Sequence, residues 1–306
     1  MSGSLVSSLA LPSGACGSSE HAEPQMDGLA SLEQSEPSSR STPTSLLAAL
    51  AQNHRTIREQ LGPHRLEVLT TFSLSPEHAL GQVHVGDALP RAQSITDHAL
   101  LEWASASSEP AAFRFMQEND HEQGREVVVV GETMYSRARH RNWFFGALQT
   151  DLVSLWLDEL SHGVRDIVQL AAPMMRIDAA GSEPNRADGR QTLTFVLSTA
   201  DTRDPTLIPN GHGQAWRQRA QVRNVSGSIT LDRHSGVWLA ADVRVDYSLD
   251  DGRGHTLLGT AGLKGTCEPS SAGTLHVSAP ANASPTPERT RYELERARLL
   301  EGLTGT

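Results

Sequence analysis

One long amphipathic segment stands between two series of short alternating segments, and this order limits the folds open to the chain. Residues 150–173 (TDLVSLWLDELSHGVRDIVQLAAP) carry apolar residues three and four positions apart, which predicts a helix with one buried face. The alternating segments are 64–75, 97–104, 111–118, 124–130, 132–139 and 141–145 before it, and 191–199, 222–232, 236–250, 255–267 and 274–279 after it. Turn-forming residues separate many of them, which is typical of antiparallel strands in a meander. The order predicts an α+β domain, a large curved antiparallel sheet with helices on one face.

Two further helices are expected near the ends of this region. Residues 43–61 have capping residues before Leu46, and Gly62-Pro63 forms a stop, which predicts one continuous helix. Residues 287–303 predict a terminal helix in which Glu and Arg alternate with leucines. Within the long helix, Gly163 is expected to permit a close approach or a bend. The valines at 127–130 suggest a strand that is covered on both faces.

The first forty-three residues differ in composition from the rest. A weakly apolar run from Leu5 to Ala15 precedes Cys16, and a polar stretch rich in Ser, Glu and Pro follows. This order resembles a bacterial lipoprotein signal, which implies acylation of Cys16 and a lipid anchor. Ser13 departs from that pattern, and no basic residue precedes Leu5, so a disordered tail is the alternative. The chain is thus expected to comprise a signal and tether (1–43), a folded domain (44–279), and a linker with a terminal helix (280–306).

Charge and cysteine content restrict the possible partners. The net charge of -10 argues against a nucleic-acid binder, which normally has a basic face. Lys264 is the single lysine, and the arginine excess is typical of a GC-rich genome. A disulfide between Cys16 and Cys267 would close a very long loop and is not expected. No run of 18 apolar residues is present.

The sequence has no recognisable catalytic pattern. Its 13 histidines show no metal-site spacing, and nucleophile-elbow and phosphate-loop patterns are absent. Asp158 and Glu159 near His162 would suit acid–base chemistry, but a solvated helix face opposite Trp156 is the simpler interpretation. We therefore expect no catalytic, cofactor or metal residues and no enzymatic activity, with a hydrolase whose site is undetected as the remaining possibility.

Two patterns within residues 64–279 resemble a known family. The first comprises Gly131, Tyr135, Arg137 and Trp143, and the second comprises Gly227, Ile229, Leu231, Asp232 and Gly236. Both are similar to the periplasmic lipoprotein-carrier and lipid-binding lipoproteins of the LolA/LppX-like family. The resemblance implies a half-barrel sheet whose concave side is covered by helices. It also implies binding or transfer of acyl chains or lipoproteins.

The predicted ligand cavity lies between the sheet and the long helix. Its candidate lining residues are Trp103, Phe113, Phe115, Tyr135, Trp156, Leu160, Val164 and Ile167. The prediction is a monomeric envelope lipoprotein, in the periplasm or on the periplasmic side of the outer membrane, whose partner is a hydrophobic ligand or an acylated protein. The alternative is a membrane-tethered structural or interaction protein in which the same residues form a filled core.

Overall fold

A computed structural model describes residues 42–77, 92–105, 111–183, 189–207, 215–250, 255–271 and 273–287. The lipoprotein-type signal with Cys16 lies outside these residues. The predicted tether, apart from its last two residues, and the terminal helix beyond residue 287 also lie outside them.

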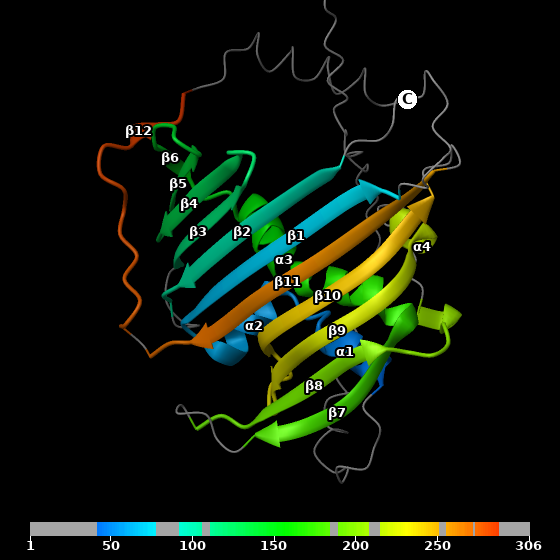
Figure 1. The fold of residues 1–306 in the computed structure, drawn as a ribbon. Coiled ribbons are helices and arrows are strands. Elements are labelled where there is room, and N and C mark those ends of the chain that lie inside the picture. Colours follow the sequence, from blue (N-terminus) through cyan, green and yellow to red (C-terminus); the bar gives the residue numbers. More distant parts are fainter. Residues whose placement is uncertain are drawn as a thin grey trace, which may run out of the picture. The chain divides into compact units, whose positions relative to one another are not determined.

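The described strands form one twelve-stranded sheet, in the order β12-β6-β5-β4-β3-β2-β1-β11-β10-β9-β8-β7 (Figure 1). The strands before the long helix are β1 (His64–Pro76), β2 (Gln93–Trp103), β3 (Ala112–Asn119), β4 (Gly124–Val130), β5 (Thr133–Ala138) and β6 (Phe144–Ala147). Those after it are β7 (Met175–Glu183), β8 (Thr192–Thr199), β9 (Gln221–Asp232), β10 (Trp238–Asp250), β11 (Thr256–Pro269) and β12 (Ser284–Pro285). All neighbours are antiparallel except β12 and β6. The expected α+β class with a large curved, unclosed sheet is confirmed.

The centre of the sheet joins strands from distant parts of the sequence. β1 pairs with β11 along its whole length, from His64 opposite Pro269 to Pro76 opposite Leu257. Successive strands run outward from β1 to β6 on one side and back from β7 to β11 on the other. The sheet therefore consists of two meanders, and the strands that pair in the middle are those farthest apart in the chain.

Alternation along most strands separates an apolar inner face from a polar outer face. In β1, Leu66 and Val68 are buried whereas Arg65 is exposed. β10 repeats the pattern, with Val243 and Val245 buried. Because successive side chains point to opposite faces, this two-residue period gives the sheet one side on which helices can pack.

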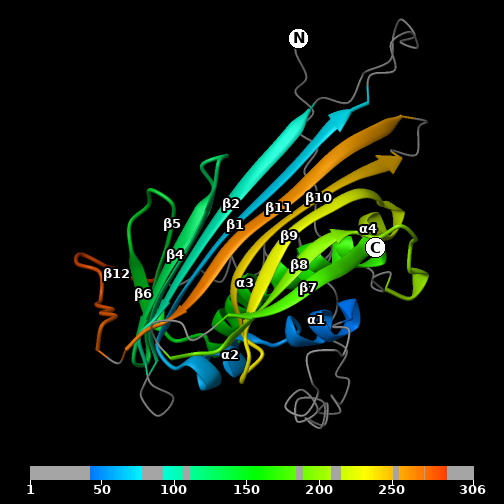
Figure 2. The same ribbon diagram turned by 60° about the horizontal axis from the view of Figure 1, so that its bottom comes forward.

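Three helices cover the inner, concave face: α1 (Pro43–Ala49), α2 (His54–Leu61) and α3 (Thr150–Ala171) (Figure 2). The predicted long helix is confirmed as α3, and Val164, Ile167 and Val168 on it are almost fully buried. It packs against β1, β9, β10 and β11. Short helical segments η3 (Ala172–Met174), η4 (Pro205–Leu207) and α4 (Ala215–Arg219) lie in connections.

The single helix predicted over 43–61 is wrong, because the chain forms two helices there. The Asn53 side chain accepts a hydrogen bond from the Thr56 N–H at 2.9 Å and so starts a second helix. Gln52 Nε2 donates to the Ser235 carbonyl at 3.0 Å, which holds the break against the β9–β10 turn. A local cap and a distant contact together override the helical periodicity.

Three other predictions also need correction. Residues 274–279 form no strand, and β7 was not predicted, although Met175 to Asp178 alternate between apolar and charged residues. No close approach occurs at Gly163, because a Cβ there would meet no neighbouring atom within 4 Å. Of the four valines, Val127, Val128 and Val129 are buried as expected, but Val130 is 36% exposed.

Candidate binding site

A pocket of about 100 Å³ opens on the concave face between α3 and strands β1, β2 and β3. The sheet contributes Val68, Thr70, Asp97, Ala99, Phe115 and Gln117, and α3 contributes Trp156, Glu159, Leu160 and Gly163. We call this pocket the α3 pocket.

Strand register explains why these side chains meet. Val68 is opposite Ala99, which is opposite Gln117, and Thr70 is opposite Asp97. All point to the inner face because they are separated by an even number of residues along their strands. On α3, Trp156, Leu160 and Gly163 lie three or four positions apart and so share one side of the helix. The missing side chain of Gly163 leaves part of the space unfilled.

Arg125 links the sheet to the helix at one side of the α3 pocket. Its Nη2 donates to Gln117 Oε1 at 2.9 Å and to Glu159 Oε2 at 3.1 Å. The guanidinium also lies 4.6 Å from the centre of the Trp156 ring and 5.7 Å from that of Phe115. Arg125 therefore neutralises Glu159 and makes cation–π contacts with two aromatic rings.

Asp97 is the second acidic group of the pocket, and no arginine or lysine of the described residues forms an ion pair with it. Burial raises the pKa of the Asp97 carboxyl, and the nearby Asp120 raises it further. A hydrogen bond involving Asn119 and the proximity of His121 act in the opposite direction. The carboxylate thus lies in a partly desolvated position without a strong counter-charge.

The eight predicted lining residues occupy three different environments. Phe115, Trp156 and Leu160 line the α3 pocket. Trp103, Phe113, Val164 and Ile167 belong to the packed core and have at most 5% of their surface exposed. Tyr135 is opposite Val128 and packs against Phe145 with ring centres 6.0 Å apart, so it faces away from the helices. The expected lining role of Tyr135 conflicts with strand alternation, because Met134 and Ser136 take the inner face.

The sequence interpretation missed the polar part of the pocket. Asp97 and Gln117 are two residues from buried positions on their strands, which places them on the inner face. Glu159 is exposed, as expected of a solvated helix face, but it also contributes to the pocket rim. Asp158 accepts the His54 backbone N–H at 3.1 Å, so the two neighbouring carboxylates serve separate contacts rather than one acid–base group.

At one end of the same strands, α2 covers the inner face completely. The Trp103 ring stacks on Phe113 at 5.1 Å between ring centres, and its indole N–H donates to the Ser105 carbonyl at 3.0 Å. His54 from α2 packs edge-on against Trp103, and its Nε2 lies 3.3 Å from the Nε2 of His64. His64 Nδ1 lies 2.7 Å from the Gly62 carbonyl oxygen. His64 Nδ1 must carry the proton to donate there, so the neutral His64 accepts from His54 at Nε2.

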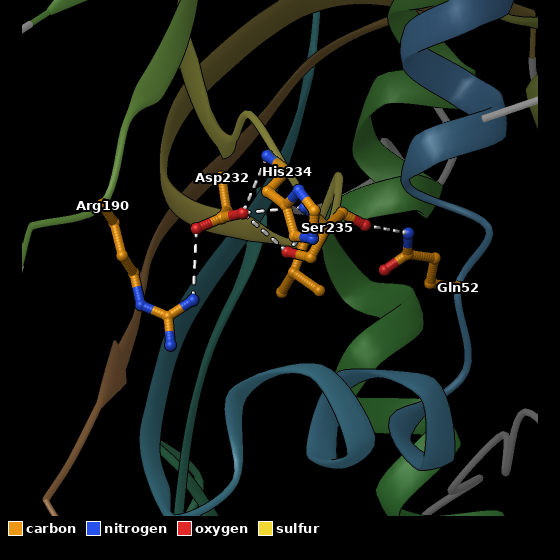
Figure 3. A network of polar contacts seen from close by, with 6 residues as sticks. Gln52, Arg190, Asp232, His234 and Ser235 are labelled. Carbon is orange, nitrogen blue, oxygen red and sulfur yellow. Dashed lines mark hydrogen bonds and ion pairs between the residues drawn. The ribbon is translucent and has the colours of Figure 1, made fainter. Parts of the chain in front are cut away.

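Asp232, a residue of the second family-like pattern, has a structural role (Figure 3). Its Oδ1 accepts from the Ser235 N–H at 2.8 Å and from the Ser235 hydroxyl at 2.9 Å, and its Oδ2 pairs with Arg190 at 3.2 Å. Although burial opposes ionisation, these hydrogen bonds hold the pKa of Asp232 below its ordinary value. Gly236 has a φ of 69°, which favours glycine. The pattern therefore encodes the β9–β10 turn, which in turn holds Gln52.

The first family-like pattern lies on the outer face. Glu126 is nearly buried between Arg114, whose Nη2 is 2.6 Å from its Oε1, and Arg137. Although burial opposes ionisation of the Glu126 carboxyl, hydrogen bonds from both arginines lower its pKa. The Arg137 guanidinium in turn lies 4.6 Å from the centre of the Trp143 ring. These residues hold β3, β4 and β5 together on the side away from the helices.

No group of three potential metal ligands occurs within the described ranges. None of the helices in those ranges has the length and apolarity needed to cross a bilayer. Cys267 is a buried free thiol, and burial raises its pKa to about 12.

Comparisons with known proteins give likenesses among solved structures. No family model and no curated protein matches the chain. A solved structure described as MucB in complex with MucA(peri) is similar at 14% identity, with a TM-score of 0.23, over 80% of this chain and 62% of that one. The chain thus spans less than two thirds of the length of that structure.

Proposed function

We propose that the protein is a non-catalytic binding protein that holds part of a hydrophobic ligand, an acyl chain or an acylated protein, against the concave face of its sheet. The observation that carries this proposal is the α3 pocket, with its floor of Phe115, Trp156 and Leu160. An open apolar recess with a few polar groups at its rim is the usual form of a binding site.

The size of the pocket limits what it can enclose. Binding cavities for whole small molecules measure roughly 300–1,000 Å³, whereas this pocket measures about 100 Å³. It therefore takes a short part of the ligand, and the remainder lies along the neighbouring inner face. Half-buried apolar side chains continue in that direction, at Phe72 and Leu74 on β1 and at Leu257 on β11.

A filling substitution tests this site. Gly163→Leu places a side chain where no neighbouring atom lies within 4 Å, so it should occupy the pocket without disturbing the core. We expect the affinity for a fluorescent fatty acid to fall about tenfold, equivalent to about 1.4 kcal/mol. Ser154→Leu is the matched control, because it adds the same group at an exposed position of α3. Equal affinities in both variants would remove the pocket from the binding site.

A second candidate is an interaction protein with a filled core, and one observation favours it. Four of the eight predicted lining residues are packed closely, with no space for a ligand around them. Native mass spectrometry of protein purified without detergent separates the two candidates. Co-purifying lipid supports the binding protein, whereas ligand-free protein that also fails to bind the fatty acid supports the filled core.

The proposed location is the cell envelope, with a monomer anchored through acylated Cys16. Support comes from the lipoprotein-like order of residues 5–16 alone. Cys16→Ser should release the protein from the membrane fraction, and unchanged fractionation would eliminate the anchor.

A further inference from the structure

The α3 pocket combines a hydrocarbon-like floor with one uncompensated negative charge. Its two acids are not equivalent, because Glu159 is bonded to Arg125 at 3.1 Å whereas Asp97 has no such partner within the described residues. Asp120 acts on Asp97 as a like charge, and His121, whose Nε2 lies 3.6 Å from Asp120 Oδ1, acts in the opposite direction. A ligand group entering the pocket therefore meets net negative charge at Asp97.

The dimensions of the pocket restrict the entering group. A cavity of about 150 Å³ accommodates benzene, with its six heavy atoms. In proportion, the about 100 Å³ beside α3 holds about four heavy atoms. A lysine side chain beyond its Cβ has that number, namely three methylene carbons and Nζ. An arginine side chain beyond its Cβ has six heavy atoms and a planar end, and a phospholipid headgroup would bring a phosphate anion towards Asp97 and Glu159.

The immediate surroundings already stabilise a cation. Arg125 lies over the Trp156 ring at 4.6 Å while it bonds to a carboxylate and to an amide oxygen. The α3 pocket offers a second cation the same kinds of group. Asp97 supplies the carboxylate, Thr70 opposite it supplies a hydroxyl, and the ring of Phe115 adds an aromatic surface.

We propose that the α3 pocket receives a lysine side chain of a partner polypeptide, with its methylene groups against Phe115, Trp156 and Leu160 and its ammonium group beside Asp97. This inference rests on the proposed function, in which the pocket anchors the ligand. It also favours a protein over a free acyl chain as that ligand. Lysine suits the pocket because it carries an apolar stem and a compact charge on one flexible side chain.

The test uses capped pentapeptides, Gly-Gly-X-Gly-Gly, in which X is lysine, norleucine or acetyl-lysine. Norleucine has a similar stem without the charge, so it reports on the apolar part of the pocket alone. Binding to the full chain is followed by the NMR shift of the Trp156 indole N–H. We expect lysine to bind about tenfold more tightly than norleucine, because an ion pair in a partly desolvated site outweighs the cost of dehydrating the ammonium group.

Two variants identify the charge responsible. Asp97→Asn should abolish the preference for lysine while leaving norleucine binding unchanged. Glu102→Gln removes the same charge from the same strand, but from the outer face, and should retain the preference. Unfolding curves of both variants establish that each is folded.

The outcomes separate this inference from the proposed function. Equal binding of lysine and norleucine overturns the lysine site but leaves the pocket as an apolar anchor. A preference for lysine that survives Asp97→Asn also overturns it, because the charge would then act elsewhere. Failure of all three peptides to bind overturns both the lysine site and the pocket as an anchor.

Discussion

One end and the middle of strands β1 and β2 follow the same alternating pattern but differ in how far they are buried. At one end, His64 and Trp103 are buried under α2 and surrounded by aromatic rings. Further along the same strands, Thr70 and Asp97 face the α3 pocket and are only partly covered. The inward direction of a side chain is thus set by the strand, whereas burial is set by the helix that lies above it.

The largest expected difference in stability is between substitutions of two tryptophans, Trp103 under α2 and Trp156 at the α3 pocket. Trp103→Ala should lower the free energy of unfolding by about 3–5 kcal/mol, because it opens a cavity in a closed core. Trp156→Ala, at the partly exposed pocket, should cost less than half as much. Urea unfolding monitored by far-UV circular dichroism measures both. Equal losses would show that the α3 pocket is as tightly packed as the core under α2.

Acidic pH should lower the free energy of unfolding through the buried histidines under α2. Burial and the neighbouring His64 lower the pKa of His54 to about 3, and burial also lowers the pKa of His64. In the unfolded chain these groups take up protons below about pH 6.5 whereas the folded protein does not, so stability falls as the pH decreases from there.

Between pH 6.5 and pH 5, His54 alone should remove about 2 kcal/mol from the free energy of unfolding. The measurement is a series of urea curves across this range. His54→Gln should flatten the pH dependence, and an unchanged slope in that variant would mean that other groups cause it.

The smallest expected effect is a gain in stability from a substitution beside the α3 pocket. Gly163→Ala should stabilise the protein by about 1 kcal/mol, because alanine favours the helix and its methyl group meets no neighbour within 4 Å. Thermal unfolding provides the measurement. A loss of stability would mean that this part of α3 is closed and that the pocket is filled in solution.

Much of the fold could be predicted from the periodicity of the sequence, because alternation and helical spacing are local properties. The errors arose where distant contacts decide the structure. Residues 274–279 alternate, yet both neighbours of β11 are already in place, so the chain continues to the edge of the sheet and pairs with β6 only at Ser284–Pro285. The second half of β7 (AAGSE) has no alternating pattern, and the strand forms there because it pairs with β8 at the edge of the sheet.

The candidate site was predictable only in part, for a related reason. Phe115, Trp156 and Leu160 were accessible as apolar residues on a strand and a helix. The meeting of Asp97, Gln117 and Glu159 depends on strand register and on the angle of α3, neither of which a single sequence specifies. Tyr135 shows that an aromatic residue on a strand must be assigned to the inner or the outer face of the sheet before it is given a role.

The pairing of β1 with β11 also bears on how the chain assembles during synthesis. These partners are separated by roughly two hundred residues, so closing the middle of the sheet carries the large entropic penalty of non-local contacts. The first meander emerges from the ribosome with the backbone of β1 unpaired on one side. That edge stays uncovered until β11, near the end of the chain, has been synthesised. Slow maturation, and a period of vulnerability to edge-to-edge aggregation, follow directly from this connectivity.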